Sequence, residues 1–346
     1  MTIKHIVLGG GGPIGIVSYG VIKQLILKKI IIYNQIKSIY STSIGCLIAL
    51  IFLLNLEYDW IDDFIIKRPW QNVWNFSTMD YINLFFTKGL CDEDIIINCL
   101  KPLFLAADID INITLKEFYN INKIEWNIIT SNLNKFTKVT LNHKTHPDLK
   151  IIQAIIMSSS IPILIKPPFY NNEYYLDGGI FSNNPINDCY LNQNCHQKEI
   201  IALINDKRKP TDLNNNYYTN LEKEIIQNDI SNNNLNQNTN IISFVIYIIK
   251  TVFKKFMIIE NENSININNV INVCLTSHNI DINYWNYVFN NPNERERLIN
   301  HGIHLANKFI NNYNYNYFNK NTNIQLYNDI SFNLNSIKPN NFILIT

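Results

Sequence analysis

The feature that most constrains this chain is a run of four glycines at positions 9–12, in a sequence of 346 residues with only eleven glycines. The run follows the apolar segment "HIVL" and precedes apolar residues at near-helical spacing. Glycine has no Cβ, so backbone N–H groups can face a bound group, and positive φ is tolerated. The pattern predicts a buried strand, a loop of exposed N–H donors and a helix whose N-terminus favours an anion.

A second strand–helix pair follows at once. "IKSIYST" (36–42) has strand character, and "IGCLIALIFLLNL" (44–56) is typical of a buried helix. Two such pairs in the first 56 residues predict an α/β fold with a parallel sheet. Residues 57–110 are expected to be helical and aromatic, and a helix before Pro162 is expected to stop there. Further strands are predicted at 125–133, 137–142 and 199–205 and in "EYYLDGG", with a strand and a helix again in "NVINVCLTS" and "ERERLINHGIHLANKFI".

Composition excludes several classes of protein. The net charge is +1, so no global field attracts nucleic acid, and no nucleic-acid partner is expected. The six cysteines form no CxxC pair, which favours free thiols of a reducing compartment over a disulfide framework or a zinc site. No secretory signal is visible, and the longest apolar run is shorter than the roughly 20 residues that span a bilayer. We expect a soluble protein, cytoplasmic or peripheral at membranes.

The glycine loop resembles two nucleotide-binding motifs incompletely. Gly10, Gly12 and Gly15 match the spacing G-x-G-x-x-G after a strand and before a helix. That motif needs an acidic residue about 20 positions later for the ribose, and the first acidic residue of the chain is Glu57. The phosphate-binding P-loop needs Lys and Ser or Thr after its last glycine, where this chain has "IV". Binding of an anion by exposed N–H groups fits the glycine spacing and needs neither the acidic residue nor the lysine that these motifs require.

A serine that could generate such an anion lies in the next unit. In "YSTSIGCL", Ser43 stands between a strand and a helix, two residues before Gly45. A serine in this type of turn presents its hydroxyl above the sheet. The usual pattern is G-x-S-x-G, whereas Ser41 occupies the first position here. An ordinary helix N-cap serine would look the same, and Ser41 is a competing nucleophile.

A third segment, "LDGGIFSNNP", places Asp177 at the end of a predicted strand. Gly178 and Gly179 follow it and would allow another backbone to pass closely. Taken alone, the segment is typical of an ordinary Asp-Gly turn.

Together the three segments resemble the patatin-like phospholipase family. Its signature is a G-G-G-x-[RK]-G loop, a G-x-S-x-G turn about 30 residues later and a D-G-[GA] turn after a long spacer. Here these are "GGGPIG" (10–15), "STSIG" (41–45) and "DGG" (177–179), in that order. "AIIMSSSIPILIKPPF" and "FSNNP" are similar to two further family segments, and the resemblance covers about 1–205. It implies a three-layer α/β/α fold with a mainly parallel central sheet.

The resemblance also implies a mechanism. Ser43 would attack an ester carbonyl, Asp177 would accept its proton, and the N–H groups of Gly10, Gly11 and Gly12 would hold the oxyanion. The turns would be supported by Ser41, Gly45, Gly15, Gly178 and Gly179. The rival hypothesis is a Ser–Asp–His triad, with the histidine taken from those after Asp177: His196, His278, His301 and His304. Two residues depart from the family pattern, since Ile14 replaces a basic residue and Ser41 replaces a glycine.

The substrate implied is a phospholipid or another acyl lipid, with no cofactor and no metal. "CDEDIIIN" (91–98) lacks the alternation of a calcium loop and favours a helix N-terminus. The aromatic segment 69–86 could line an acyl pocket, touch a membrane or fill the core. Segment 241–259, with interleaved lysines, could lie in a bilayer interface or form a core helix. A catalytically inactive lipid- or partner-binding member and a nucleotide-binding protein remain the alternatives.

The domain organisation follows from a shift in composition. We expect one patatin-like catalytic domain over 1–312, interrupted by a flexible Asn-rich insert at 206–240. Residues 313–346 are expected to form an Asn/Tyr-rich tail.

Overall fold

The structure is a computed structural model, and it describes most of the first 312 residues. The described ranges are 2–73, 88–206, 244–245, 247–248, 251–252, 255–256, 259–260, 263–274 and 282–312. The chain forms two compact units, Met1–Ala306 and Asn307–Thr346. The second unit is described only over residues 307–312, which are helical. The sheet, the cores and the candidate site all belong to the first unit.

A mainly parallel eight-stranded sheet forms the centre of the first unit, in the order β10-β9-β1-β2-β4-β8-β7, with β5 paired to β4. Five strands run parallel, and β5, β7 and β8 are joined by antiparallel pairs. The strands are β1 His5–Leu8, β2 Ser38–Thr42, β4 Glu125–Asn132, β5 Thr137–Leu141, β7 Phe169–Tyr170, β8 Glu173–Asp177, β9 Ile200–Ile204 and β10 Asn269–Asn272. The predicted α/β fold with a parallel sheet is confirmed.

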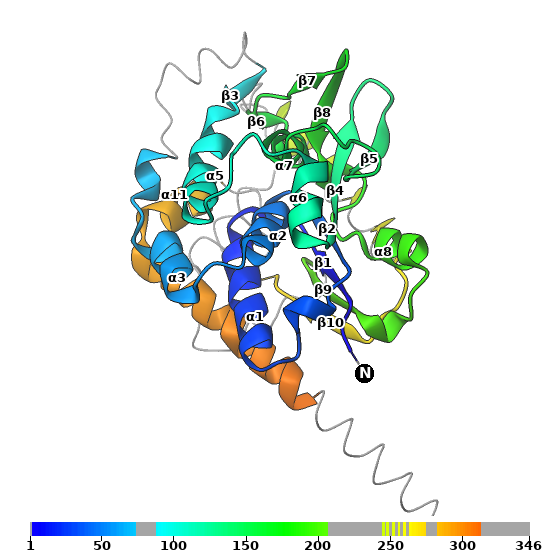
Figure 1. The fold of residues 1–346 in the computed structure, drawn as a ribbon. Coiled ribbons are helices and arrows are strands. Elements are labelled where there is room, and N and C mark those ends of the chain that lie inside the picture. The colour runs from blue at the N-terminus through cyan, green and yellow to red at the C-terminus, as the bar shows by residue number, and fades with distance from the viewer. Residues whose placement is uncertain are drawn as a thin grey trace, which may run out of the picture. The chain divides into compact units, whose positions relative to one another are not determined.

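Helices cover both faces of this sheet. The α-helices are α1 Gly15–Leu27, α2 Ile44–Leu54, α3 Tyr58–Lys67, α5 Asp94–Ala106, α6 Leu115–Asn122, α7 Ile151–Ser159, α8 Ile186–Gln193 and α11 Ile282–Asn290. Short 3₁₀ turns are η1 Gly12–Ile14, η2 Tyr33–Gln35, η3 Trp70–Asn72, η4 Gly178–Ile180 and η5 Gln197–Glu199. Residues 292–312 are also helical. Figure 1 shows α1 and α2 in front of the strands, and α8 beside the sheet away from them.

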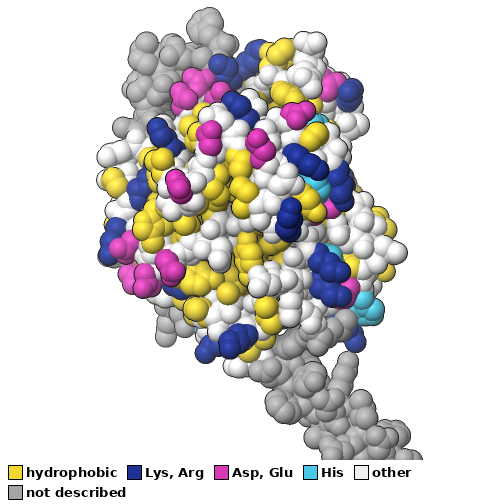
Figure 2. All heavy atoms as spheres, viewed as in Figure 1, with side chains coloured by type: hydrophobic (Ala, Val, Ile, Leu, Met, Phe, Trp, Pro, Cys, Tyr) yellow, Lys and Arg dark blue, Asp and Glu magenta, His cyan; other side chains and the backbone are white. Residues whose placement is uncertain are grey.

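The central strands β1 and β2 are buried on both faces, as continuous apolar runs predict. On the α8 face, Val7, Tyr40 and Ala202 project from neighbouring strands into one cluster with Cys189 of α8. On the opposite face, α1 packs on α2, and α2 and α7 pack on the strands. Figure 2 views this second face, where apolar side chains gather between charged residues.

The prediction for residues 57–110 was wrong in one respect. A short strand, β3 (Gly89–Cys91), lies within this range and pairs in parallel with β6 (Ile163–Ile165) as a separate two-stranded sheet. Three residues are too few to show a period of two, so the pattern did not reveal either strand. The acidic segment at 91–98 does begin a helix, because α5 starts at Asp94.

Several sequence-based expectations fall outside the described residues. The predicted insert at 206–240, apart from Asp206, and the predicted tail at 313–346 are among them. All six cysteines are free. Within the part of the chain that the structure describes, no helix is both long and apolar enough to cross a membrane.

One buried arginine ties the C-terminal ends of α3 and α11 together. The side chain of Arg295 is among the most buried in the protein, with 1% of the residue exposed. Its guanidinium donates to the carbonyls of Ile65, Ile66 and Arg68 at the end of α3 and of Val288 and Phe289 in α11, at 2.6 to 3.3 Å. The partial negative charge of two helix C-termini therefore compensates the buried cation.

We expect Arg295→Lys to lower the free energy of unfolding by about 3 kcal/mol, because an ammonium has three donors and leaves buried carbonyls unpaired. Chemical denaturation at pH 7 measures this loss. Arg297→Lys is the matched control, since Arg297 pairs with Glu294 instead of with helix ends. A loss no larger than that of the control would show that the guanidinium does not hold the two helices.

Candidate active site

Ser43 occupies a strained turn between β2 and α2. Its φ is 53° and its ψ is −124°, a backbone conformation that residues other than glycine rarely adopt. The turn is tight because α2 begins against the end of β1. A Cβ on Gly45 would lie 2.3 Å from the carbonyl oxygen of Leu8, so only glycine fits there. The sharp turn brings Ser43 to the carboxyl edge of the parallel strands.

The backbone of Ser43 is held by another serine. Its N–H donates to Ser158 Oγ at 2.9 Å, and Ser158 Oγ donates to the carbonyl of Ile129 at 2.6 Å. Ser158 lies in α7, in the run "SSS" that precedes Pro162. The sequence analysis did not identify Ser158 as a residue of the site. Its fixed position explains how the strained turn is maintained.

Ser41, the competing nucleophile, is inaccessible. It is fully buried within β2, where its hydroxyl accepts from Trp126 Nε1 at 2.8 Å and donates to Cys46 Sγ at 3.2 Å. The serine that replaces the usual glycine is thus accommodated by two polar partners. Ser43 is the serine of this turn that faces the cavity described below.

Asp177 ends β8 and turns its carboxyl into the protein interior. One carboxyl oxygen, Oδ1, accepts the Gly179 N–H at 2.7 Å. The other, Oδ2, is buried and accepts no hydrogen bond from any residue that the structure describes. The Asp177 backbone is fixed by Ser131 Oγ, which donates to its carbonyl, and by the carbonyl of Ser160, which accepts its N–H.

Burial raises the pKa of Asp177 from 3.8 to about 6. The Ser43 hydroxyl and the Gly179 N–H oppose this rise, with the larger effect from Ser43. The hydroxyl lies close enough to lower the pKa of the carboxyl, while Asp177 Oδ2 accepts no hydrogen bond from the described residues. Ser43 and Asp177, 134 positions apart in sequence (177 − 43), are brought together.

The glycine loop lies directly beside Ser43. A Cβ on Gly10 would be 3.2 Å from the Cβ of Ser43. The Gly10 N–H donates to the carbonyl of Asn183 at 3.1 Å, so it is not available to a ligand in this conformation. The N–H groups of Gly11 and Gly12 have no hydrogen-bond partner among the described residues.

Gly12 has a φ of +59° and lies under an aromatic ring. A Cβ there would be 2.3 Å from Cζ2 of Trp285 in α11. The sequence analysis did not connect Trp285 with the loop, because nothing near position 285 signals the contact.

Gly15 and Gly178 allow neighbouring segments to pack closely, and Gly179 binds Asp177. Gly15 opens α1, and a Cβ on it would lie 2.3 Å from Ile44 Cγ1 at the start of α2. A Cβ on Gly178 would lie 2.2 Å from the carbonyl oxygen of Ile129 in β4. Gly179 supplies the N–H that binds Asp177. The three segments predicted to converge do so.

Two asparagines lock the glycine loop in place. Asn183 Nδ2 donates to the carbonyl of Gly10 at 3.3 Å, and Asn205 Nδ2 donates to the same oxygen at 3.1 Å. Asn183 belongs to "FSNNP", whereas Asn205 follows β9. The side chain of Asn205 was not predicted to take part.

An apolar cavity of about 160 Å³ opens at Ser43 and Gly12. Its walls come from several helices and are almost entirely hydrophobic. They include Ile48, Ile51, Phe64, Trp70, Leu100 and Phe289. Trp70 is thus the described aromatic residue of segment 69–86 that lines a pocket, while residues 74–86 lie outside the described part of the chain.

No histidine contacts Ser43 or Asp177 within the described ranges. His196 is exposed and caps η5, as its polar surroundings predicted, whereas His301 is buried in the helix 292–312. His278 lies outside the described residues. Over the same ranges, no three His, Cys, Asp or Glu side chains are grouped as metal ligands would be.

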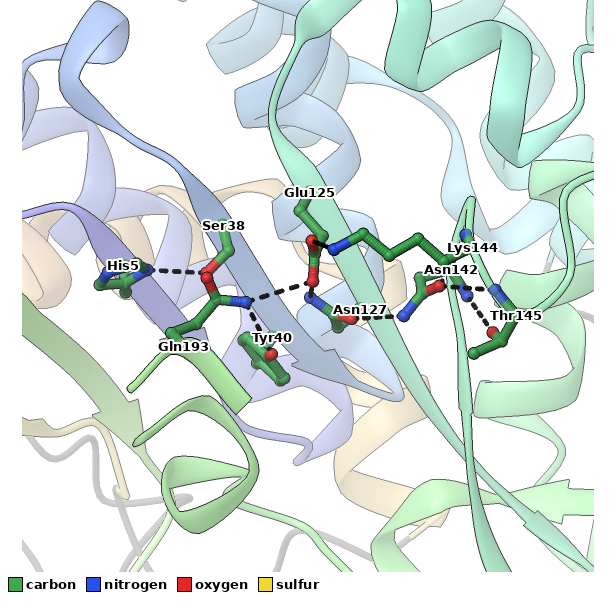
Figure 3. A network of polar contacts seen from close by, with 9 residues as sticks. All are labelled: His5, Ser38, Tyr40, Glu125, Asn127, Asn142, Lys144, Thr145 and Gln193. Carbon is green, nitrogen blue, oxygen red and sulfur yellow. Dashed lines mark hydrogen bonds and ion pairs between the residues drawn. The ribbon is translucent and has the colours of Figure 1, made fainter. Parts of the chain in front are cut away.

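A buried polar network lies at the opposite, amino-terminal edge of the sheet (Figure 3). There His5 Nδ1 is 2.8 Å from Ser38 Oγ, Gln193 donates to Glu125, and Lys144 pairs with Glu125. Ser38 is fully buried, so this Ser–His pair cannot reach a substrate. The network joins the starts of β1, β2 and β4 and stabilises the fold.

Comparison with known proteins gives the same family as the motifs. The family model "Patatin-like phospholipase" matches residues 6–190, which contain both Ser43 and Asp177. The chain belongs to the patatin-like phospholipase family. Ile14 and Ser41 are its departures from the family loop and turn, and both are buried.

Two viral proteins are similar over 186 residues, or 53% of this chain. "Probable lipid hydrolase 463L" of Invertebrate iridescent virus 6 is 28% identical, and the match covers 62% of its length. "Uncharacterized protein R571" of Acanthamoeba polyphaga mimivirus is 27% identical, with 60% of its length covered. The chain therefore matches only about three fifths of each relative. The solved structure of VipD from Legionella pneumophila aligns with 90% of this chain and 67% of its own, at 16% identity and a TM-score of 0.49.

We expect Asp177→Asn to stabilise the protein at pH 8 by up to about 3 kcal/mol, the equivalent of a pKa raised from 3.8 to about 6. A raised carboxyl pKa means that the folded state loses stability as pH rises from 3.8 through 6, when the buried group must ionise. The gain of the variant should therefore be complete at pH 8 and small near pH 4. Denaturant titrations of both proteins at the two pH values measure it, and an equal difference at both would contradict an unusually buried charge.

Proposed function

We propose that this patatin-like protein is a serine lipid acyl hydrolase of the phospholipase A type, which cleaves fatty-acyl esters through a Ser–Asp dyad. The observation that carries the proposal is the convergence of three groups around Ser43, which together with Gly12 lines the apolar cavity. They are the Ser43 hydroxyl, the Asp177 carboxyl and the N–H groups of Gly11 and Gly12, which bind no other described residue. Family membership and the printed name of the iridescent virus relative, a probable lipid hydrolase, support it.

The chemistry begins with Asp177 as general base. Its ionised carboxyl takes the proton of Ser43 as the serine oxygen bonds to the ester carbonyl carbon. Collapse of the tetrahedral intermediate breaks the bond to the leaving alcohol, which receives the proton from Asp177. Water then attacks the acyl-enzyme by the same route and releases the fatty acid. A pKa of about 6 leaves the base mostly ionised at neutral pH while keeping it basic enough to accept a proton.

The oxyanion is assigned to the N–H groups of Gly11 and Gly12. Gly10, also predicted as a donor from the family resemblance, already binds Asn183 and supports the loop instead. Loss of one oxyanion donor typically raises the barrier by about 3 kcal/mol. The N–H of Ile44, at the N-terminus of α2 directly after Ser43, is a further candidate.

The cavity determines the substrate class. Its apolar walls fit a fatty-acyl chain, with the ester at Ser43 and the alcohol portion outside. A nucleotide would require polar or charged groups around its phosphates and base, and these walls do not supply them. The proposal needs no metal and no cofactor.

We expect a fluorophosphonate probe to label wild-type protein covalently at Ser43, as located by peptide mass spectrometry. Ser43→Ala should abolish labelling and hydrolysis of a soluble ester. Asp177→Asn should lower both by more than about a hundredfold, because the base is lost. Activity of the wild type should fall as pH decreases through about 6, since protonated Asp177 cannot accept the serine proton.

Four further variants test the triad: His196→Ala, His278→Ala, His301→Ala and His304→Ala should each keep most of the activity. A histidine variant as inactive as Ser43→Ala would overturn the dyad. Folded wild-type protein that no probe labels would support the inactive, lipid-binding alternative.

The proposal includes peripheral contact with a lipid surface. The described residues between 244 and 260 are helical and expose large apolar side chains by 37 to 47%. These are Phe244, Val245, Ile248, Val252 and Ile259. This exposure supports the interfacial interpretation of segment 241–259.

The same apolar surface continues toward the candidate site. Phe256 of this helix lies 6.1 Å from Phe181, which in turn lies 4.9 Å from Phe136 at the β4–β5 tip, measured between ring centroids. Phe136 is 57% exposed. Phe181 follows Asp177 by only four residues, and Lys250, Lys254 and Lys255 add positive charge to the sequence of segment 241–259. Apolar residues with interleaved lysines are typical of helices that lie in anionic membrane surfaces.

We expect the triple variant Phe244→Asn, Ile248→Asn, Val252→Asn to bind anionic phospholipid vesicles at least about tenfold more weakly in flotation assays. Hydrolysis of a soluble ester should be unchanged. The matched control is Leu105→Asn, Leu191→Asn, which alters two more strongly exposed apolar residues on α5 and α8. Equal flotation of the two variants and the wild type would contradict a role for this helix.

A further inference from the structure

Glu260, which lies beyond the matched family region in the sequence, binds the loop that follows Asp177 with its carboxylate. Glu260 accepts three hydrogen-bond donors from consecutive residues. Its Oε2 accepts the N–H of Asn183 at 2.7 Å, and its Oε1 accepts the N–H of Asn184 at 3.0 Å and the hydroxyl of Ser182 at 2.8 Å. Successive backbone N–H groups form a concave anion site, here filled by the protein's own side chain.

The loop 182–184 that Glu260 binds is the point where the site's segments meet. The carbonyl of Ser182 accepts the hydroxyl of Thr42, the residue before Ser43, at 2.8 Å. Asn183 binds both the N–H and the carbonyl of Gly10. Asn184 Oδ1 accepts the N–H of Asn205 at 3.2 Å. A displacement of this loop would therefore shift the serine turn and the glycine loop together.

The surroundings of Glu260 supply no cation that touches its carboxyl among the described residues. Ser182 Oγ is shared with Asp188, at 3.2 Å, and Asp188 in turn pairs with Lys138 at 2.5 Å. Burial raises the pKa of Glu260, and the donors from Ser182, Asn184 and Asn183 oppose this rise. Among the described residues, hydrogen bonds from loop 182–184 hold the carboxylate, so the position of the carboxylate and the conformation of the loop depend on each other.

We infer that Glu260 is a positioning residue for acyl transfer, which holds loop 182–184 so that Gly11 and Gly12 face the oxyanion beside Ser43. The inference rests on the proposed function of the Ser43 site. It assigns a catalytic purpose to Glu260 itself, separate from the proposed contact of segment 241–259 with lipid. The carboxylate acts through Asn183 and Gly10 and touches no substrate.

The test measures acyl-enzyme formation with a soluble p-nitrophenyl ester, so that lipid binding plays no part. Glu260→Gln keeps the size of the side chain but turns an amide toward donors. We expect it to lower kcat by about tenfold to a hundredfold with KM nearly unchanged, as small misplacements of a reacting geometry do. Ser182→Ala, which removes one of the three donors, should give a smaller loss.

Chemical rescue separates positioning from packing. Glu260→Ala leaves an open anion site, and sodium formate should restore at least about a third of the lost rate, while sodium chloride should not. Glu117→Ala is the matched control, because Glu117 also accepts a backbone N–H, that of Thr114, in an exposed helix cap far along the chain. Formate should leave the rate of this control unchanged.

The outcomes distinguish the two hypotheses. Wild-type protein that fluorophosphonate does not label would refute the proposed function itself. Labelled wild type with Glu260→Gln and Glu260→Ala as fast as wild type would refute the positioning role alone. A loss of rate that formate does not rescue, and that parallels a lower melting temperature, would also refute it, since Glu260 would then serve only stability.

Discussion

The site depends on the close approach of α2 to the end of β1. Because a Cβ on Gly45 would meet the carbonyl of Leu8, the helix can begin there only if the preceding residue turns sharply. Ser43 therefore adopts a left-handed conformation that costs on the order of 1–3 kcal/mol. The sheet register and the Ser158 hydrogen bond maintain it. The same approach brings the glycine loop, which leaves β1, against the serine turn, which leaves β2.

The parts of the site that follow strand ends were predictable from the sequence. Ser43 directly follows β2 and the glycines directly follow β1, so a parallel sheet had to bring them to one edge. The position of Asp177 was predictable only from its motif, because β8 is antiparallel to its neighbour and the end of an antiparallel strand need not lie at that edge. The partners of these residues were not predictable. Ser158 lies 115 positions from Ser43, and a serine near a helix end carries no local sign of a distant backbone partner. Sequence also could not tell which glycine N–H groups the fold would occupy.

Two buried charged side chains, Arg295 and Asp177, differ in how fully their polar atoms are hydrogen-bonded. Arg295 finds a carbonyl for each of its five N–H donors, as a purely structural cation in a low-dielectric interior must. Asp177 is equally buried, yet its Oδ2 accepts nothing from the described residues. A carboxylate buried with few partners lowers stability and has a raised pKa, which the proposed role as general base requires. The unsatisfied oxygen is thus the better indicator of function.

Completion of the site requires residues beyond the matched family region, 6–190. Asn205 follows β9 and binds the carbonyl of Gly10, Glu260 holds the loop after Asp177, and Trp285 covers Gly12. Motif residues in the first 190 positions supply the hydroxyl, the carboxyl and the N–H donors. The later segments, which sequence motifs do not describe, also contact these residues and help to place them. Differences in rate or acyl preference among proteins with the same three motifs can therefore arise in these later segments, where the motifs themselves are unchanged.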